Sequence, residues 1–345
     1  MPPPNQLQLS VVIATLGRPI LVQTLQSLVR CVGFEEIEVL VCGRLHDPDT
    51  HAVVTRLGSL HPNIRHLEVS FPVGDSSEKK NAGWRAARSD LVAFLDDDVV
   101  VAPDWPLRMR EPFAEAKTAV VSGPSLVPPE VGLFARLAGL ALSSPAAGYV
   151  AARYRVAGSG PVAIGWSKII GCNMCYRREV LEELGGFDPA FWPGEEVIAA
   201  FRVQQGGNRL LFHAAAWVYH YPRQSFSRFW RQIHGYGATR VRLCRSGVEI
   251  EPTTFVPALW VLSLIALGGA ALFATWARRL LVLDLALYAT VVAAITLIMV
   301  RESRRMCDLL LLLVIPVMHL SYGLGSWIEF LWPGKDLSER PVGAE

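Results

Sequence analysis

The fold of this chain is constrained most by three long apolar runs near its C-terminal end. They cover residues 255–276, 280–300 and 309–332 and contain few charges. A helix of about 20 apolar residues crosses the roughly 30 Å of hydrocarbon in a bilayer. Buried core helices of a soluble domain can also be apolar, but three such runs in succession favour three transmembrane helices.

The composition of the whole chain agrees with membrane attachment. Its 345 residues are 51% hydrophobic, which exceeds the usual share in a soluble enzyme. The formal net charge of +2 is too small to indicate a nucleic-acid partner. Residues 1–8 are proline-rich and polar, unlike a secretory signal, so we expect the catalytic part to stay in the cytosol.

Arginines beside the apolar runs predict the orientation of the chain in the membrane. Six precede the first run with no acidic residue among them: Arg223, Arg228, Arg231, Arg240, Arg242 and Arg245. Arg301, Arg304 and Arg305 lie between the second and third runs. Positive charges accumulate on the cytoplasmic side, which places both groups inside, although Arg278 and Arg279 between the first two runs oppose this. Three crossings would leave the C-terminal tail outside.

Three consecutive aspartates mark a candidate metal site. Asp96, Asp97 and Asp98 stand between apolar stretches at residues 91–95 and 99–101. A continuous apolar run is typical of a central strand in a parallel sheet, and ligands collect at the carboxyl ends of such strands. Asp96 and Asp98 could hold Mg2+ or Mn2+ through carboxylate oxygens and leave positions for phosphate. An acidic turn or a helix cap would produce the same pattern.

Further motifs stand around the triplet in an order known from one enzyme family. In chain order they occupy residues 81–90, 171–174, 185–188 and 194–196, with Arg202 behind them. Over roughly the first 240 residues the chain resembles the family 2 glycosyltransferases. The resemblance implies an α/β fold of the GT-A (Rossmann-like) type that binds a nucleotide sugar. It also identifies Asp96 and Asp98 as the D-x-D motif that holds the metal on the donor diphosphate.

These features predict how the chain is organised. We expect a catalytic GT-A domain at residues 1–222, a basic amphipathic interfacial helix and linker at 223–252, three transmembrane helices at 253–333 and a polar tail at 334–345. The apolar segment at residues 131–142 is too short to cross a bilayer and predicts an interfacial helix or a lid. The layout resembles bacterial membrane-attached glycosyltransferases of exopolysaccharide assembly, which implies the bacterial inner (plasma) membrane.

The resemblance assigns donor-binding residues to three segments of the chain. They are Thr15, Arg18, Lys80, Asn81, Asp96 and Asp97. Thr15 and Arg18 follow a first strand predicted at residues 9–14, in a loop that contacts the nucleotide in this family. Lys80 and Asn81 would approach the diphosphate from a helix that begins at a serine cap, although Lys80 could also lie on an exposed helix face.

One departure from the family pattern leaves the nucleotide open. The second strand, predicted at residues 37–41, ends in Cys42-Gly43-Arg44, where the family usually has an Asp-rich turn that binds the base. Asp47 or Asp49 could take that role, or could simply be solvated. We expect a UDP-sugar as the donor.

The acceptor-binding residues implied by the resemblance are Gly171, Asn173 and Asp188. The first two lie in a strand predicted at residues 169–174. A helix predicted at residues 178–184 follows and ends at two glycines. Asp188 then begins the loop that leads to the catalytic pair.

The catalytic residues implied by the resemblance are Glu195 and Glu196. Glu196 aligns with the second acid of the family's acidic pair, the general base that takes the proton of the acceptor hydroxyl. The family usually has Asp at that position, and Ile198 stands where a further acid is common. The pair could instead cap the helix that follows.

His220 completes the predicted metal residues. It lies in a strand predicted near residues 217–222, and neutral imidazole is a ligand that Mn2+ accepts. A hydrogen-bonded structural histidine would fit the same position.

The sequence therefore predicts an inverting glycosyltransferase of cell-surface polysaccharide or glycolipid biosynthesis. Its expected partners are a nucleotide-sugar donor, a lipid-linked acceptor and the membrane. One alternative is a transferase whose acceptor is polyprenyl phosphate itself. Another is a catalytically silent sugar-nucleotide-binding subunit of a polysaccharide export complex, which the missing second-strand Asp and Ile198 would favour.

Overall fold

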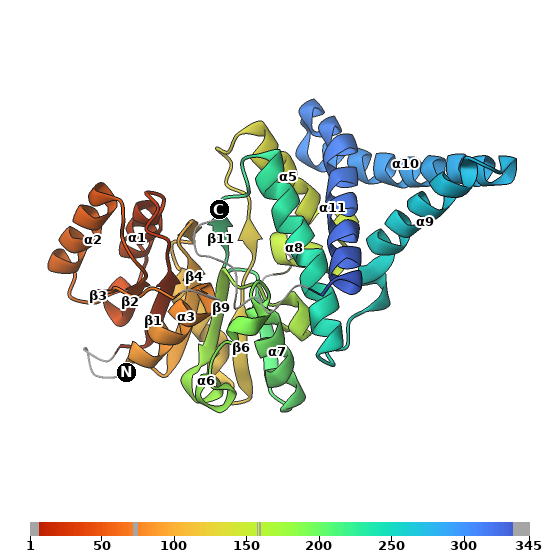
Figure 1. Cartoon of the computed structure of the whole chain (residues 1–345). Coiled ribbons are helices and arrows are strands. Elements are labelled where there is room, and N and C mark those ends of the chain that lie inside the picture. The colour runs from red at the N-terminus through yellow and green to blue at the C-terminus, as the bar shows by residue number, and fades with distance from the viewer. Residues whose placement is uncertain (1–6, 72–74, 157, 159, 334–345) are drawn as a thin grey trace. The chain divides into compact units, whose positions relative to one another are not determined.

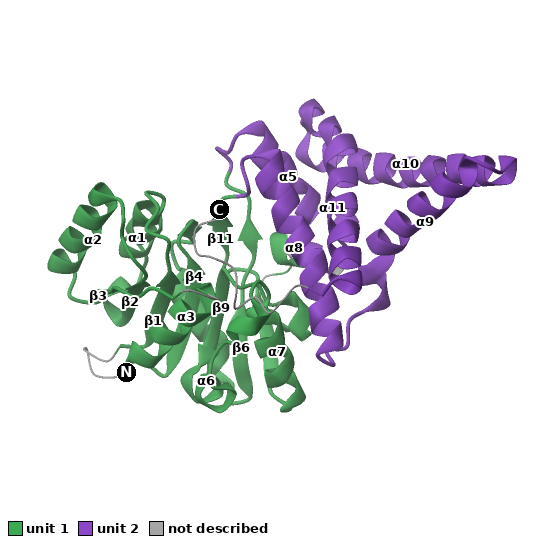
Figure 2. Cartoon of the chain, in the orientation of Figure 1, with its two compact units in different colours: residues 1–128, 152–221, 335–345 green, residues 129–151, 222–334 purple. Residues whose placement is uncertain are grey.

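The computed structural model describes residues 7–71, 75–156, 158 and 160–333. Figure 2 shows its two compact units: unit 1 is formed by residues 1–128 and 152–221, and unit 2 by residues 129–151 and 222–334, each within the described ranges. The sequence suggested one domain for all of residues 1–222, whereas residues 129–151 group with the C-terminal helices. The predicted tail at 334–345 lies outside the described residues.

Unit 1 is built on an eight-stranded mixed sheet of order β3-β2-β1-β4-β9-β6-β10-β8 (Figure 1). Its strands are β1 (Leu9–Ala14), β2 (Ile37–Cys42), β3 (Ile64–Leu67), β4 (Leu91–Asp96), β6 (Thr118–Ser122), β8 (Pro161–Ala163), β9 (Asn173–Arg177) and β10 (Arg209–His213). β4 pairs in parallel with β1, as expected, but its other neighbour, β9, is antiparallel.

A second sheet of three short strands lies beside the carboxyl end of β4. It consists of β5 (Val99–Val101), β7 (Ser125–Leu126) and β11 (Val218–His220), in the order β5-β11-β7. β11 pairs antiparallel with β5 and parallel with β7. The aspartate triplet thus stands where the chain passes from β4 of the large sheet to β5 of the small one.

Helices cover both faces of the large sheet. They are α1 (Leu21–Val29), α2 (Pro48–Leu60), α3 (Asp75–Ala86), α4 (Trp105–Arg110), α6 (Arg178–Leu184) and α7 (Glu195–Gln205), with short 3-10 turns η1 (Phe34–Glu36), η2 (Glu111–Ala114), η4 (Trp166–Lys168) and η5 (Pro189–Phe191). Successive residues of a strand point to opposite faces, so Val11 and Ile13 join one buried cluster and Val12 the other. Unit 1 is therefore a three-layer α/β fold.

The strand predicted at residues 169–174 begins later than expected. Ile169 and Ile170 are buried, which makes them look like strand residues, but each packs into a different core cluster. The chain turns here, because the Asn173 amide donates to the Ile170 carbonyl at 3.2 Å. β9 begins only at Asn173, whereas α6 occupies the predicted range and ends at Gly185, whose φ of 71° suits glycine.

Unit 2 contains the apolar helices. They are α5 (Leu133–Ser143), α8 (Phe226–Arg245), α9 (Val256–Ala271), α10 (Thr275–Ser303) and α11 (Leu311–Leu331), with η6 (Pro252–Phe255) and η7 (Met306–Leu310); η3 (Pro145–Tyr154) connects α5 back to unit 1. Three segments are long and apolar enough to cross a membrane: Pro252–Ala271, Thr275–Ser303 and Met306–Leu331. They match the three runs seen in the sequence.

α8 lies within residues 223–252, where the sequence predicts an interfacial helix and linker, and it packs along α11. A Cβ atom on Gly237 would lie 2.1 Å from the Tyr322 carbonyl oxygen, and one on Gly325 would lie 2.1 Å from that of His234. The two backbones therefore meet where neither helix has a side chain. Phe229 of α8 is only 1% exposed.

Candidate functional site

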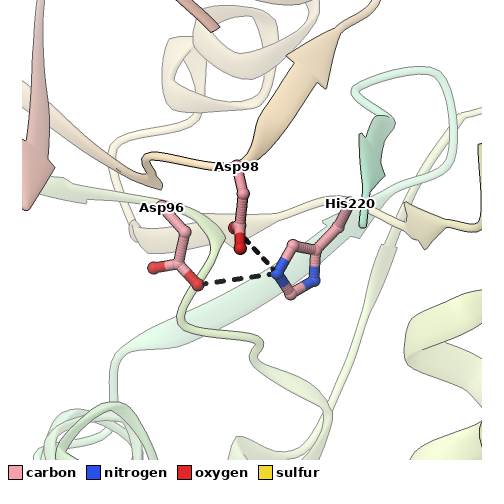
Figure 3. Close-up of side chains that lie close together, drawn as sticks. All are labelled: Asp96, Asp98 and His220. Carbon is pink, nitrogen blue, oxygen red and sulfur yellow. Dashed lines mark ion pairs between the residues drawn. The ribbon is translucent and has the colours of Figure 1, made fainter. Parts of the chain in front are cut away.

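Asp96, Asp98 and His220 come together at the junction of the two sheets (Figure 3). The ligand atoms of the three side chains lie within 4.8 Å of one another. His220 Nε2 is 3.1 Å from Asp98 Oδ1 and 3.9 Å from Asp96 Oδ2. These distances suit a shared cation.

Strand register explains this meeting of residues that are far apart in the sequence. β4 ends at Asp96 and β5 begins at Val99, so the triplet makes the turn between them. β11 pairs with β5 so that His220 stands opposite Val99. The Tyr221 amide also donates to the Asp98 carbonyl at 3.3 Å.

The charges around this cluster favour a cation. Burial disfavours the imidazolium, yet Cys172 and the Asp98 carboxylate outweigh it and raise the pKa of His220 well above its ordinary value. Burial also raises the pKa of Asp96; Lys80 and His220 oppose that rise, and Asp98 and Asp97 add to it. Two carboxylates and one imidazole form a donor set that fits Mn2+ or Mg2+.

Asp97 contacts the first loop, whereas Asp96 and Asp98 lie beside His220. Its Oδ2 accepts hydrogen bonds from Thr15 Oγ1 at 2.7 Å and from the Leu16 amide at 3.1 Å. Thr15 and Asp97 are 1% and 3% exposed, and the hydrogen bond between them fixes the first loop. Their predicted contact with a donor stays a prediction. Arg18 pairs with Asp97 and Asp98 but keeps 39% of its side chain exposed. It is the residue of this loop that can reach a phosphate.

The side-chain amide of Asn81 clamps the backbone at Phe187, and its predicted contact with the donor stays a prediction. Its Nδ2 donates to the Phe187 carbonyl at 2.7 Å, and its Oδ1 accepts from the Phe187 amide at 2.8 Å. The side chain is buried. A Cβ on Gly186 would lie 2.3 Å from Asn81 Oδ1, which explains why a glycine stands beside the clamp.

Lys80 forms a buried ion pair with Glu195. The distance from Nζ to Oε1 is 2.8 Å, and each residue is 3% exposed. Burial by itself raises the pKa of Glu195, but the charge and hydrogen bond of Lys80 outweigh it and lower that pKa. Glu195 is therefore the ionised partner of Lys80, and both connect α3 to α7.

Glu196 is placed differently from Glu195, although they are adjacent in the first turn of α7. Apart from the backbone amide of Glu196 itself, no group among the described residues donates a hydrogen bond to this carboxylate. The carboxylate lies against Gly171, where a Cβ would be 3.6 Å from Oε2. Burial, and then the charge of Glu195, raise the pKa of Glu196, while Arg153 and Lys80 oppose the rise. A partly accessible carboxylate with a raised pKa suits a general base.

The profile of glycosyl transferase family 21 matches residues 17–333 of this chain. The chain belongs to that family. The match confirms the resemblance to a family 2-type glycosyltransferase that the motifs indicated.

Two known proteins are similar to this family 21 chain, one in sequence and one in structure. The succinoglycan biosynthesis protein ExoM of Rhizobium meliloti (strain 1021) is 32% identical over 124 residues, which cover 35% of this chain and 40% of that protein. The solved structure of the mannosyltransferase PcManGT from Pyrobaculum calidifontis, in complex with GDP-Man and Mn2+, matches with a TM-score of 0.60. It is 17% identical and covers 96% of this chain and 88% of that one, so it supports the fold alone.

Two of the acceptor-binding residues expected in this family 21 enzyme have structural contacts. Asn173 is fully buried, donates from Nδ2 to the Ala216 carbonyl at 2.8 Å and accepts from Trp105 Nε1 at 2.9 Å. Its role in binding the acceptor stays a prediction. Asp188 accepts from the Ala190 amide and pairs with Arg202 at 3.6 Å, with 34% of its side chain exposed. Gly171, beside Glu196, is the predicted residue that lies at the candidate base.

The structure adds residues that the sequence did not suggest. Arg153 is 6% exposed, donates from Nε to the Ser167 carbonyl at 3.0 Å and acts electrostatically on Glu196. Cys172 interacts with His220. Arg153 belongs to a segment without a motif, so no sequence signal could have identified it.

Proposed function

We propose that this family 21 glycosyltransferase moves one sugar, with inversion, from a nucleoside-diphosphate sugar to a lipid-linked acceptor in cell-surface polysaccharide assembly. The observation that supports it most is the pairing of a possible cation site with a separate accessible carboxylate. Lys80 interacts electrostatically with Asp96 of the first and with Glu196 of the second, which supports assigning both to one site.

On the donor side, Asp96, Asp98 and His220 would hold Mg2+ or Mn2+, which supplies positive charge to a diphosphate leaving group. Arg18 can add a further positive charge from the first loop, because part of its guanidinium remains exposed. Lys80 keeps Glu195 ionised and in place. These residues bind and orient a donor and do not react with it.

On the acceptor side, Glu196 would take the proton as the acceptor oxygen bonds to the anomeric carbon and the nucleotide leaves. The other carboxylates described at the site are engaged: Glu195 with Lys80, Asp97 with the first loop, Asp96 and Asp98 with His220, and Asp188 with Arg202. Direct displacement inverts the anomeric carbon and needs only one free carboxylate, as the base. A covalent intermediate would need a second free carboxylate as nucleophile, and the described residues of the site offer none.

Membrane attachment supports a lipid-linked acceptor at the bacterial inner membrane with unit 1 in the cytoplasm. The three apolar segments would keep the site near the bilayer, and the similarity to ExoM supports exopolysaccharide biosynthesis. The sequence favours a UDP-sugar, whereas the solved mannosyltransferase is in complex with GDP-Man. Both nucleotides therefore belong in the test.

The test is transfer of radiolabelled sugar by the purified full-length chain in detergent with Mn2+. UDP-sugars and GDP-sugars are supplied in turn with lipids extracted from a polysaccharide-producing bacterium. We expect one donor to label a lipid-linked saccharide and Asp98→Asn to abolish labelling. Asp90→Asn is the matched control, since Asp90 lies exposed just before β4.

Two outcomes would contradict parts of this proposal. Label on polyprenyl phosphate without a preceding saccharide would identify the other acceptor class. Absence of both transfer and donor hydrolysis with every nucleotide sugar, while the protein still binds one of them, would identify a silent binding subunit.

A further inference from the structure

The first end of α11 is held by a buried ion pair to α5. Asp308, in the turn before α11, is fully buried and paired with Arg136, whose NH2 donates to Oδ2 at 2.7 Å. Ser303 at the end of α10 donates to the same carboxylate. Arg136 lies eight residues after Pro128, the last residue of unit 1 before this insertion.

The second end of α11 is held by charged contacts to α8. Arg242 Nε lies 3.7 Å from Glu329 Oε2. Arg245 donates to the carbonyls of Glu329 and Phe330 at 3.0 and 2.8 Å. α8 begins at Phe226, close in the chain to Tyr221, where unit 1 ends.

The two ends are about one bilayer thickness apart. Asp308 and Glu329 are 21 residues apart by their numbers, and at 1.5 Å per residue this corresponds to about 32 Å. The hydrocarbon core is about 30 Å thick. If α11 stood upright in the membrane, one charged end would lie on the face opposite to the other.

An upright α11 would carry α8 across the bilayer with it. The two helices run in the same direction, because Ser321 Oγ donates to the Trp230 carbonyl and Ser326 Oγ to that of Gly237. α8 contains five arginines: Arg228, Arg231, Arg240, Arg242 and Arg245. Each arginine near the centre of a spanning helix costs about 2.5–3.5 kcal/mol. Within the described chain, α8 is also not among the segments apolar enough to cross.

The reverse upright orientation is excluded by the short connection to α5. It would place Asp308, and therefore Arg136, on the face away from unit 1. Four extended residues and one helical turn separate Pro128 from Arg136, which gives a backbone reach of about 20 Å. That is less than the hydrocarbon thickness of about 30 Å.

We propose that α11 lies in the plane of the membrane surface with α5 and α8, and that only α9 and α10 cross the bilayer. Within unit 2, Figure 1 shows α5, α8 and α11 running alongside one another, while α10 extends away from α11 in a different direction. The partly or fully exposed stripe of α11 is apolar throughout: Leu313, Val317, Leu320, Leu324, Ile328 and Leu331. Such a stripe fits the acyl chains below the headgroups.

The partner of this helical layer is an anionic lipid surface. Arg228, Arg231 and Arg245 are exposed on α8, where they can meet lipid phosphates. The chain would then leave α11 on the face where unit 1 lies. Two crossings also keep the tail residues Lys335 and Arg340 on the basic side of the membrane, in agreement with the positive-inside rule.

Cysteine labelling tests this topology without any transfer assay. In a background where the exposed Cys244 and Cys307 are replaced by Ser, single cysteines are introduced as Thr275→Cys, at the start of α10, and Ser338→Cys, beyond α11. An impermeant maleimide is added to spheroplasts and to inverted membrane vesicles of the full-length protein. We expect the two positions to be labelled from opposite faces.

Labelling of both positions from the same face would show that α11 crosses and would overturn the proposal. An epitope tag after Glu345 gives a second reading, because protease added to the face that labels Ser338→Cys should remove it. The assay reports sidedness alone, so it can fail or succeed independently of the proposed transferase activity. The assay also measures the number of membrane crossings, for which the sequence predicts three.

Discussion

Replacing each of two adjacent glutamates should have opposite effects on stability and activity. Glu196 has a raised pKa, so the folded protein binds its proton more tightly than the unfolded chain does. At neutral pH its ionised form therefore reduces stability. Glu196→Gln removes that charge and should leave the melting temperature unchanged or higher at pH 7.

Glu195→Gln should act in the other sense. The pKa of Glu195 is lowered in the folded state by its pairing with Lys80, so its stabilising effect is present at neutral pH and is lost as the pH falls through the folded pKa. Removing one partner of a buried ion pair costs about 3–5 kcal/mol. At about 2–4 °C per kcal/mol for a domain of this size, the melting temperature should fall by roughly 6–20 °C.

The variant that keeps its stability, Glu196→Gln, should be the one that loses its activity. Loss of a general base costs about 10²- to 10⁴-fold in kcat, or about 2.7–5.4 kcal/mol of barrier. Glu196→Gln should show this loss with donor KM within a few-fold, and Glu196→Asp should retain more activity. The raised pKa also places the acidic limb of the wild-type kcat/KM profile above the ordinary glutamate range near pH ~4.3.

The assays are thermal unfolding in detergent and transfer kinetics across pH, on both variants and the wild type. Near-normal kcat in Glu196→Gln would remove Glu196 as the base. A melting temperature lowered as far in Glu196→Gln as in Glu195→Gln would refute the distinction between a free and a paired carboxylate.

Three further predictions concern the cation site and two buried contacts. EDTA should abolish turnover and Mn2+ should restore it, with His220→Gln raising the Mn2+ concentration for half-maximal activity about tenfold or more; full activity in EDTA would exclude the metal. Asn81→Ala should lower the free energy of unfolding by about 1–3 kcal/mol for each unpaired group while donor KM stays within threefold; a large KM change would return Asn81 to the donor site. Arg136→Met should leave Asp308 buried and unpaired and cost about 3–5 kcal/mol, measured by thermal unfolding, with Asp308→Asn in the same chain restoring part of it.

The local pattern of the sequence was sufficient for the strand that ends at Asp96 and for the helix that ends at Gly185. Both depend on residues next to one another, a buried apolar run in one case and a glycine after a helix in the other. The order of motifs then indicated the fold, which the match to the solved mannosyltransferase structure confirms. Residues 91–101 by themselves do not require His220 to lie near the aspartates. The antiparallel pairing of β5 and β11 brings it there.

The contacts that the sequence did not indicate belong to polar residues whose partners lie far away in the chain. Asn81 and Asn173 occupy motif positions, and a motif does not distinguish an amide that binds a ligand from one that clamps a loop. Lys80 and Glu195 are separated by 115 positions, so their pairing was not readable from either segment. The close packing of Gly237 against α11 likewise requires the tertiary structure.

The insertion of α5 into the first half of the chain has a consequence for synthesis. Arg136 is made 172 residues before Asp308, and at roughly 5–20 residues per second a ribosome needs about 9–34 s to cover that distance. During this interval α5 has no partner in unit 2 at its charged end, while the strands of unit 1 are still being completed. An apolar helix of this kind can bind a lipid surface. Attachment of the nascent chain to the membrane through α5 would then precede the emergence of the apolar helices that anchor it.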